Sequence, residues 1–220
     1  QPSHISMNNR RTSFTGGNQG SVAFPVRQRV RFSYPRGTEG LVPTLDRKKP
    51  YQTLGVNHAR EYFACGIDTL DQYLVRQATQ DIRRRASACY VAVETGSGKV
   101  AGYYTLAAAS VPLTDLPKAL AERLPRYPSV PVARVGRLSV DKSFQGQKLG
   151  GALLADAALR EPRSELAVFA LVVDAKDDAA EAFYRLHGFE RYGLEARQWI
   201  VPLERFALRV ARCFAAAANT

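Results

Sequence analysis

A strand, a glycine loop and a helix follow one another directly in the second half of this chain. Residues Val132–Asp141 have the composition of a β-strand, and residues Lys148–Arg160 are typical of an apolar helix. Gly146 lies between the strand and the helix, and Gly150 and Gly151 lie in the first turn of the helix. Such a connection leaves several backbone N–H groups unpaired at the helix N-terminus, where glycine allows close approach. The helix dipole favours negative charge at the same point, so we predict a phosphate-binding loop.

The predicted loop differs from the two common nucleotide-binding loops. It has neither the G-x-x-x-x-G-K-[ST] pattern nor the G-x-G-x-x-G pattern. Lys148 would add a full positive charge. The alternative interpretation is that these glycines serve only a tight turn. The candidate binding residues of the loop are Gln145, Gly146, Gln147, Lys148, Leu149, Gly150 and Gly151.

The rest of the chain from residue 51 alternates between strand and helix patterns. This order predicts a single α+β or α/β domain built on a mixed sheet. The turn between the first two strands is Thr95–Gly98, and Asp68 is the expected N-cap of the first helix. We predict strands over Ala88–Glu94, Lys99–Ala109, Leu166–Asp174 and Arg197–Pro202, and helices over Ile67–Arg84, Leu116–Leu124, Ala179–Leu186 and Leu203–Ala218.

Composition excludes several classes of protein. With 220 residues, the chain has the length of one domain with extensions or of two small domains. It contains no apolar run of about 18 residues, which excludes a transmembrane helix, and it opens on no signal-like segment. Its few cysteines and histidines are far apart in the sequence, so we expect no disulfide framework, no zinc site and a reducing cytoplasm. They are Cys65, Cys89, Cys213, His4, His58 and His187.

Positive charge is concentrated in the first quarter of the chain. The net charge is +11; residues 1–50 contribute 9 basic and 2 acidic residues (+7), and residues 51–220 contribute 22 and 18 (+4). We interpret residues 1–50 as a basic extension, either a solvated arm or an arm for nucleic acid or a partner protein. Within it, Gln1–Ser6 resemble a vector remnant, and Val26–Phe32 alternate as in a two-faced strand.

The loop resembles the acetyl-CoA-binding motif of GCN5-related N-acetyltransferases (GNAT), Q/R-x-x-G-x-G/A. Gln145 matches the first position and Gly150 the last, while Lys148 replaces the central glycine. A second register, from Gln147 to Ala152, also fits. Downstream, Phe183-Tyr184 and Gly188-Phe189 match the A-x-x-F-Y-x-x-x-G-F ending of the family.

This resemblance implies a GNAT fold, a central mixed, mostly antiparallel and splayed sheet flanked by helices. It also implies that acetyl-CoA is the acetyl donor, without a metal, and that backbone groups of Leu138, Ser139 and Val140 hold its pantetheine arm. Tyr184 would be the general acid for the departing thiolate. A thiol has a reference pKa of about 8.5 and a phenol about 10, so a positioned tyrosine can supply that proton. The alternative for Phe183-Tyr184 is an aromatic pair in the core.

A larger set of motifs, spread over residues 61–203, resembles the TacT-like toxins of type II toxin–antitoxin modules. Members of that subfamily acetylate the α-amino group of aminoacyl-tRNA and so stop translation. Their antitoxins are usually ribbon-helix-helix proteins, and homodimers are common. The motifs include Leu70-Asp71-x-Tyr73-Leu74, Gly102-Tyr103-Tyr104-Thr105-Leu106, Leu124-Pro125-Arg126-Tyr127-Pro128 and Gly136-Arg137-Leu138-Ser139-Val140-Asp141. We therefore divide the chain into the extension 1–50, a GNAT domain 51–205 and a C-terminal helix 206–220.

An α-amine has a reference pKa near 8, against about 10.4 for lysine, so such an acceptor needs little help from a general base. A tRNA acceptor also needs phosphate contacts. Arg134 and Arg137 would lie on opposite faces of a regular strand, unless a bulge forms at Gly136. The candidate phosphate-binding residues are Arg83, Arg84, Arg85, Arg134, Arg137 and Lys142.

Three alternatives stay open. Arg83–Arg85 can equally be a solvated helix end, where cations are favourable. The enzyme can be an N-acetyltransferase for a small amine or for a protein or peptide amine. The chain can also be an RNA-binding module without catalysis, although such a module has no need of the Tyr184 hydroxyl.

Overall fold

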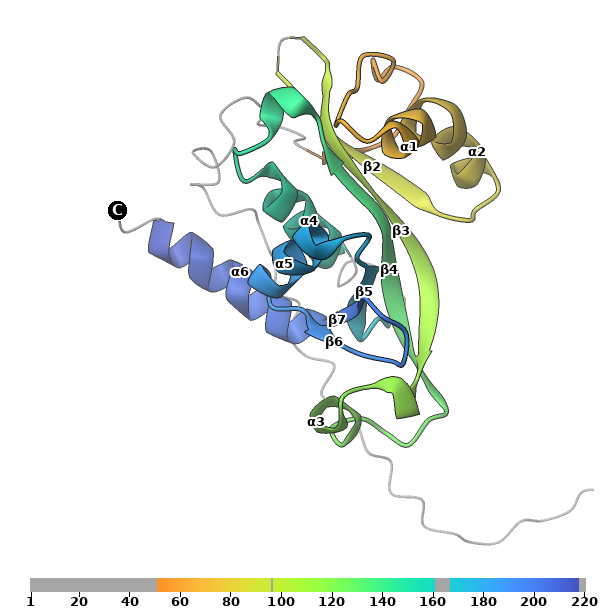
Figure 1. Ribbon diagram of the computed structural model, residues 1–220, viewed down its shortest axis with the longest axis vertical. Helices are drawn as coiled ribbons and strands as arrows, with labels where there is room; N and C mark the ends of the chain where they lie inside the picture. Colours follow the sequence, from red (N-terminus) through yellow and green to blue (C-terminus); the bar gives the residue numbers. More distant parts are fainter. Residues whose placement is uncertain (1–50, 96, 161–166, 218–220) are drawn as a thin grey trace, which may run out of the picture. The chain divides into compact units, whose positions relative to one another are not determined.

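The computed structural model describes residues 51–95, 97–160 and 167–217. They form one seven-stranded sheet with strand order β1-β2-β3-β4-β5-β7-β6 (Figure 1). All neighbouring strands run antiparallel except β4 and β5, which are parallel. The predicted mixed, mostly antiparallel sheet is thus confirmed. The strands are β1 (Tyr51–Thr53), β2 (Ala88–Val93), β3 (Val100–Pro112), β4 (Ser129–Val140), β5 (Ala170–Asp174), β6 (Glu190–Arg191) and β7 (Gln198–Pro202).

The sheet opens between β4 and β5. The two strands pair only from Val132↔Ala170 to Val135↔Val173. Beyond that point β4 continues to Val140 beside β3, while β5 ends at Asp174. The remaining part of β4 therefore presents one edge without a strand partner among the described residues, as the predicted splay requires.

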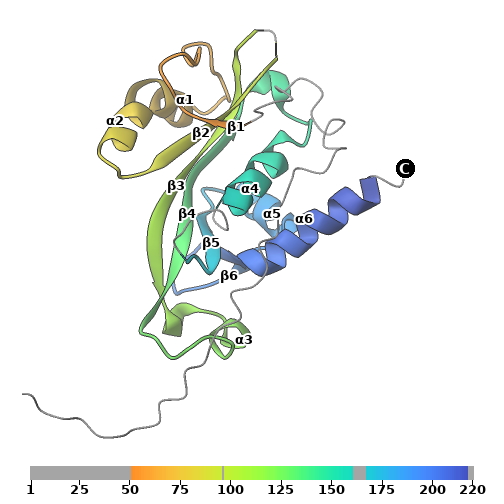
Figure 2. The ribbon, with the colours of Figure 1, turned by 180° about the vertical axis from the view of Figure 1, so that it is seen from behind.

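Helices cover both faces of the sheet (Figures 1 and 2). Neighbouring residues of a strand point to opposite faces, and Tyr103 and Tyr104 belong to different cores. Tyr104 packs with α4 (Leu149–Arg160), α5 (Asp178–Leu186) and α6 (Leu203–Ala217), so we call that side the α4 face. Tyr103 packs with Tyr73 and Leu74 on the opposite side, the α1 face.

The first predicted helix is interrupted. Instead of one helix over 67–84, α1 (Asp68–Gln72) and α2 (Ala78–Arg83) flank a π-helical turn at Tyr73–Gln77. The wider turn accompanies the burial of two successive side chains, Tyr73 and Leu74. The predicted N-cap was wrong, because Ile67 occupies that position and Asp68 is already helical.

Other differences concern short elements. β1 and β6 were not predicted, because strands of two or three residues carry too little alternation to detect. The predicted helix 116–124 shortens to α3 (Lys118–Ala121), and a 3₁₀ turn precedes it at Leu113–Asp115. Val26–Phe32 and residue 96 of the predicted hairpin turn lie outside the described residues.

Candidate active site

The glycine loop runs from the end of β4 to the start of α4. Its residues 145–148 are exposed, and both Gly146 (φ 76°) and Lys148 (φ 62°) adopt left-handed backbone conformations. Lys148 stands where the family motif has its central glycine, so this chain makes the same turn with a strained non-glycine residue. A Cβ atom at Gly146 would meet nothing within 4 Å. The loop thus offers open backbone on its outer side.

Two glutamine side chains of this loop donate hydrogen bonds to nearby backbone carbonyl groups. The Gln145 Nε2 atom donates to the carbonyl oxygens of Val140 and Cys65, both at 3.0 Å. Gln147 Nε2 donates to the carbonyl oxygen of Ser143 at 3.1 Å. Gln145 therefore holds the loop against the end of β4, and Gln147 ties it to the preceding 3₁₀ turn.

The glycines at the start of α4 have a packing role. A Cβ atom at Gly150 would lie 3.4 Å from the Phe183 ring, and one at Gly151 would lie 2.7 Å from His187 Nε2. Glycine at these positions lets the first turn of α4 approach α5 closely. Leu149, between the loop and these glycines, is buried. Only part of the glycine pattern is thus available to a ligand, and part is explained by helix packing.

Asp141 is an anchor of the loop that sequence reasoning did not select. Its carboxylate accepts hydrogen bonds from Ala64 N and Ser143 N, both at 2.9 Å, and from Lys99 Nζ at 3.2 Å. Burial alone would raise the pKa of Asp141, but these three donors outweigh burial and lower it. Asp141 caps the 3₁₀ turn Lys142–Phe144. The signal available in the sequence was its place as the last residue of the predicted strand.

A bulge at Gly136 brings two arginines to one face. The register between β3 and β4 shifts from Thr105↔Arg137 to Leu106↔Val135, so Gly136 has no partner on β3. Since Thr105 and Ala107 share a face, their partners Arg137 and Arg134 share it as well. The sequence left open whether the two arginines diverge, and the bulge places both on the α1 face.

Each of these arginines already has a contact. Arg134 forms an ion pair with Asp174 at the end of β5. The Arg137 guanidinium lies 3.6 Å from the centre of the Tyr73 ring, and the Tyr73 hydroxyl donates to Asp81 Oδ2 at 2.9 Å. The π-helical turn that buries Tyr73 therefore positions Arg137 beside the opening between β4 and β5.

Tyr184, the predicted general acid, lies in the core of the α4 face. It lies on α5, is 8% exposed, and packs against Phe183 and Phe189 with ring centres 5.3 Å away in each case. Burial, and secondarily the charge of Asp174, raise its pKa to about 12. The phenol is therefore fully protonated at neutral pH and is able to donate a proton.

The raised pKa of Tyr184 predicts a loss of stability in alkali. Its folded-state pKa of about 12 exceeds the reference of about 10, so its contribution, roughly 3 kcal/mol, is present below pH 10 and is lost between about pH 10 and 12. Burial also raises the pKa of Tyr103 and Tyr104, which adds to the trend. Urea unfolding at successive pH values should show a constant midpoint up to about pH 8. It should then decline slightly near pH 9, because burial raises the pKa of the Cys89 thiol to about 12, and fall more steeply above pH 10. A constant urea midpoint up to pH 12 would contradict the predicted loss of stability in alkali.

The pantetheine candidates occupy the unpaired stretch of β4. Leu138, Ser139 and Val140 pair on one side with Tyr104, Tyr103 and Gly102 of β3. On their other side β5 has already ended its pairing with β4. Their second edge is therefore the one at which the sheet opens, next to the glycine loop.

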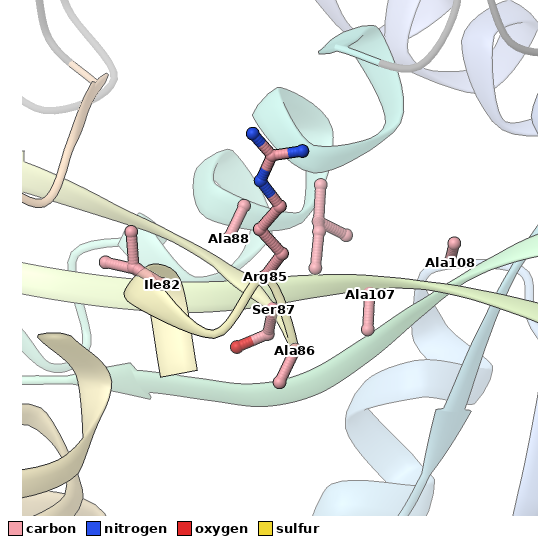
Figure 3. Close-up of a pocket in the computed structure, with 8 residues that line it drawn as sticks. Ile82, Arg85, Ala86, Ser87, Ala88, Ala107 and Ala108 are labelled. Atoms are coloured by element: carbon pink, nitrogen blue, oxygen red, sulfur yellow. The ribbon is translucent and has the colours of Figure 1, made fainter. Parts of the chain in front are cut away.

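The remaining basic candidates lie on the surface. Arg83, Arg84 and Arg85 are exposed at the end of α2, and Lys142 is exposed in the 3₁₀ turn before the loop. Arg85 borders an open pocket of about 330 Å³ at the edge of β3, where β2 begins at Ala88 (Figure 3). The pocket is lined by Ile82, Arg85, Ala86, Ser87, Ala88, Leu106, Ala107 and Ala108.

Lys148 offers a test that separates backbone strain from charge. We expect Lys148→Gly to stabilise the fold by about 0.5–1 kcal/mol, because glycine adopts the left-handed conformation without strain. Lys148→Gln keeps the strain and removes the same charge. Thermal unfolding of both variants measures the difference. Equal unfolding midpoints for Lys148→Gly and Lys148→Gln would contradict the assignment of strain to Lys148.

Within the described segments, no three His, Cys, Asp or Glu side chains gather in a way that could hold a metal ion. No helix among the described residues has the length and apolarity needed to cross a bilayer.

A mixed sheet that opens between two parallel strands, with a glycine loop before the next helix, is the arrangement expected from the resemblance to GNAT acetyltransferases. Residues 85–191 match the family model described as an acetyltransferase (GNAT) domain. The tRNA-acetylating toxin of Mycobacterium tuberculosis is 36% identical over 130 residues, which cover 58% of this chain and 76% of that protein. A probable toxin TacT of Sinorhizobium fredii is 27% identical over 157 residues, covering 70% of this chain and 83% of the relative.

Solved structures agree with these matches. The structure of AtaT complexed with acetyl-methionyl-tRNAfMet superposes with a TM-score of 0.67 at 26% identity, covering 73% of this chain and 98% of that one. AtaTR bound with acetyl-CoA gives a TM-score of 0.64 at 25% identity, covering 76% and 99%. The chain belongs to the GNAT acetyltransferase family, and within it to the relatives of tRNA-acetylating toxins.

Proposed function

We propose that this chain is the toxin of a toxin–antitoxin module and transfers an acetyl group from acetyl-CoA to the α-amino group of an aminoacyl-tRNA, which blocks translation. The observation that carries the proposal is the pair of arginines that the bulge at Gly136 brings to one face of the sheet, beside the opening between β4 and β5. Tyr184 comes from the α4 face, and Arg134 and Arg137 come from the α1 face. The related toxin of M. tuberculosis is named for tRNA acetylation.

Acetyl-CoA fits the opening between β4 and β5. The stretch Leu138–Val140 would offer backbone groups for the pantetheine amides along the edge that has no strand partner, where the Val140 carbonyl already accepts from Gln145 Nε2. The exposed turn at residues 145–148 and the N-terminus of α4 offer N–H donors for the diphosphate, and Lys148 offers a cation. Gly146 leaves the space above the turn free. The bound donor supplies a thioester, whose carbonyl carbon receives the amine.

The protein contributes mainly positioning and one proton. Tyr184 gives its phenolic proton to the departing thiolate, and its raised pKa keeps that proton in place at neutral pH. Backbone N–H groups along the free edge of β4 would stabilise the developing oxyanion. A large share of the acceleration should come from holding the amine beside the thioester.

The tRNA would lie over the α1 face. Arg83, Arg84 and Arg85 at the end of α2 and Lys142 near the loop are exposed and supply phosphate contacts. Arg137 packs over the Tyr73 ring and lies on the part of β4 that no longer pairs with β5, so it would contact the acceptor end of the tRNA. Because Arg134 is already paired with Asp174, we expect a smaller share of phosphate binding from it.

The proposal includes the biological setting. The module would act in the cytoplasm, with a ribbon-helix-helix antitoxin as partner and a homodimer as the working assembly. A structure of a mutant AtaT toxin has been solved bound to the C-terminus of the antitoxin AtaR and acetyl-CoA. Residues 1–50 would be a basic extension of the catalytic domain 51–205, and residues 206–220 would be a C-terminal helix and tail.

Labelled acetyl-CoA incubated with the protein and total charged tRNA tests the activity. We expect label on RNA, released by mild alkali that cleaves the aminoacyl ester. The same tRNA after deacylation is the control and should take no label. Label found only on protein or on small amines would instead support the acetyltransferase alternatives, and binding of RNA without any transfer would support a non-catalytic module.

A further inference from the structure

A strip of the α1 face lies between two separate cores. Around Tyr103 the face is covered by the core of α1 and α2, and around Val132 and Val172 by the core that includes Leu120 of α3. Between them the face carries polar side chains, those of Arg134, Arg137 and Thr105 on β3 and β4 and of Asp174 on β5.

Asp174 occupies the position at which the sheet opens. It directly follows Val173, the last residue of β5 that pairs with β4. It lies two residues beyond Val172, the partner of Arg134, so both side chains lie on the α1 face. The Asp174 side chain is 54% exposed, and Arg134 contacts only its Oδ2 atom. In the described part of the chain, Oδ1 accepts no hydrogen bond.

The charges around Asp174 come from several elements. Arg134 on β4 forms an ion pair with Asp174. Besides burial, the charge of Asp174 raises the pKa of Tyr184 on α5 and of Tyr192 after β6. Asp174 is therefore a half-exposed carboxylate at the opening between β4 and β5, held in orientation by Arg134.

We propose that Asp174 binds the α-ammonium group of the acceptor and places its nitrogen at the opening between β4 and β5. This inference rests on the proposed function and names the residue that recognises the amine. The phosphates of tRNA are repelled by a carboxylate, whereas the α-ammonium is a cation that every aminoacyl-tRNA carries at its acceptor end. A carboxylate within a basic surface thus selects that end of the substrate.

The reaction balances with these two residues. The ammonium releases one proton through the Asp174 carboxylate to water, which leaves a neutral amine. The amine nitrogen then forms a bond to the acetyl carbonyl carbon, and the carbon–sulfur bond breaks. The thiolate takes the proton of Tyr184, and the excess proton on nitrogen passes to water and back to the tyrosine. The products are the acetylated aminoacyl-tRNA and the free thiol.

The test uses discrimination between an amine and a hydroxyl. Nitrous acid converts aminoacyl-tRNA into the 2-hydroxyacyl-tRNA, which has the same shape but no ammonium. For the wild-type protein we expect the hydroxyacyl form to bind about 10- to 100-fold more weakly than the aminoacyl form. In Asp174→Asn, which keeps the size of the side chain, the two forms should bind nearly equally. The affinity for acetyl-CoA should stay unchanged.

The matched control is Asp178→Asn, which removes an exposed carboxylate paired with Arg197 on the nearby α5. It should keep the wild-type discrimination. A discrimination ratio in Asp174→Asn equal to that of the wild type would overturn this inference but not the proposed function. Thermal unfolding of the variant checks separately that it is folded. Failure of the wild type to label any charged tRNA would instead overturn the proposed function and this inference together.

Discussion

Replacing Tyr184 with phenylalanine is expected to lower kcat for acetyl transfer by about 10²- to 10⁴-fold, the range typical of a lost general acid. The variant removes one hydroxyl and keeps the ring that packs against Phe183 and Phe189. The affinity for acetyl-CoA should therefore be unchanged, and expression in cells should no longer be toxic. Single-turnover acetylation and calorimetric titration measure the two quantities.

Phe183 provides the control for this prediction. It neighbours Tyr184, packs beside Gly150 and carries no ionisable group. Phe183→Leu should change stability more than kcat. Full toxicity and an unchanged kcat in Tyr184→Phe would remove Tyr184 from the mechanism and favour a solvent molecule as the acid.

Replacing Asp156 with alanine is expected to cost about 3–5 kcal/mol of folding free energy, because it leaves a partly buried guanidinium without its counter-charge. Asp156 lies on α4 and is 3% exposed. Its Oδ2 atom accepts from Arg160 Nε at 2.7 Å and from the Tyr104 hydroxyl. Arg160 also lies 4.0 Å from the centre of the Tyr90 ring and thereby joins α4 to the sheet.

Urea unfolding of Asp156→Ala measures this cost, and two variants calibrate it. Tyr104→Phe removes a single hydroxyl from the same cluster and should cost about 1–2 kcal/mol. Glu204→Gln breaks an exposed ion pair with Arg123 and should cost less than about 1 kcal/mol. A loss below 1 kcal/mol in Asp156→Ala would mean that this cluster does not stabilise the contact between α4 and the sheet.

The elements that the sequence predicted well are those with long periodic patterns. The apolar run ending at Asp174 became a buried strand, and the helix after the glycine loop ends at Arg160 as expected. The π-helical turn at Tyr73 was not predictable, because the residues around it fit an ordinary helix; it accompanies the burial of Tyr73 and Leu74, and the Tyr73 ring stacks on Tyr103. β1 and β6 owe their extended form to pairing with β2 and β7.

By itself, the sequence predicted the chemistry of this protein, from a strand, a glycine loop and a helix that resemble an acetyl-CoA site and a tyrosine about 35 residues later that fits a general acid. These are local patterns of residue type and spacing. Only the tertiary structure decided that Arg134 and Arg137 share a face, because the bulge at Gly136 depends on the register with β3. It likewise placed Asp174 in contact with Arg134 at the opening of the sheet, since that requires β4 and β5 to pair and then separate.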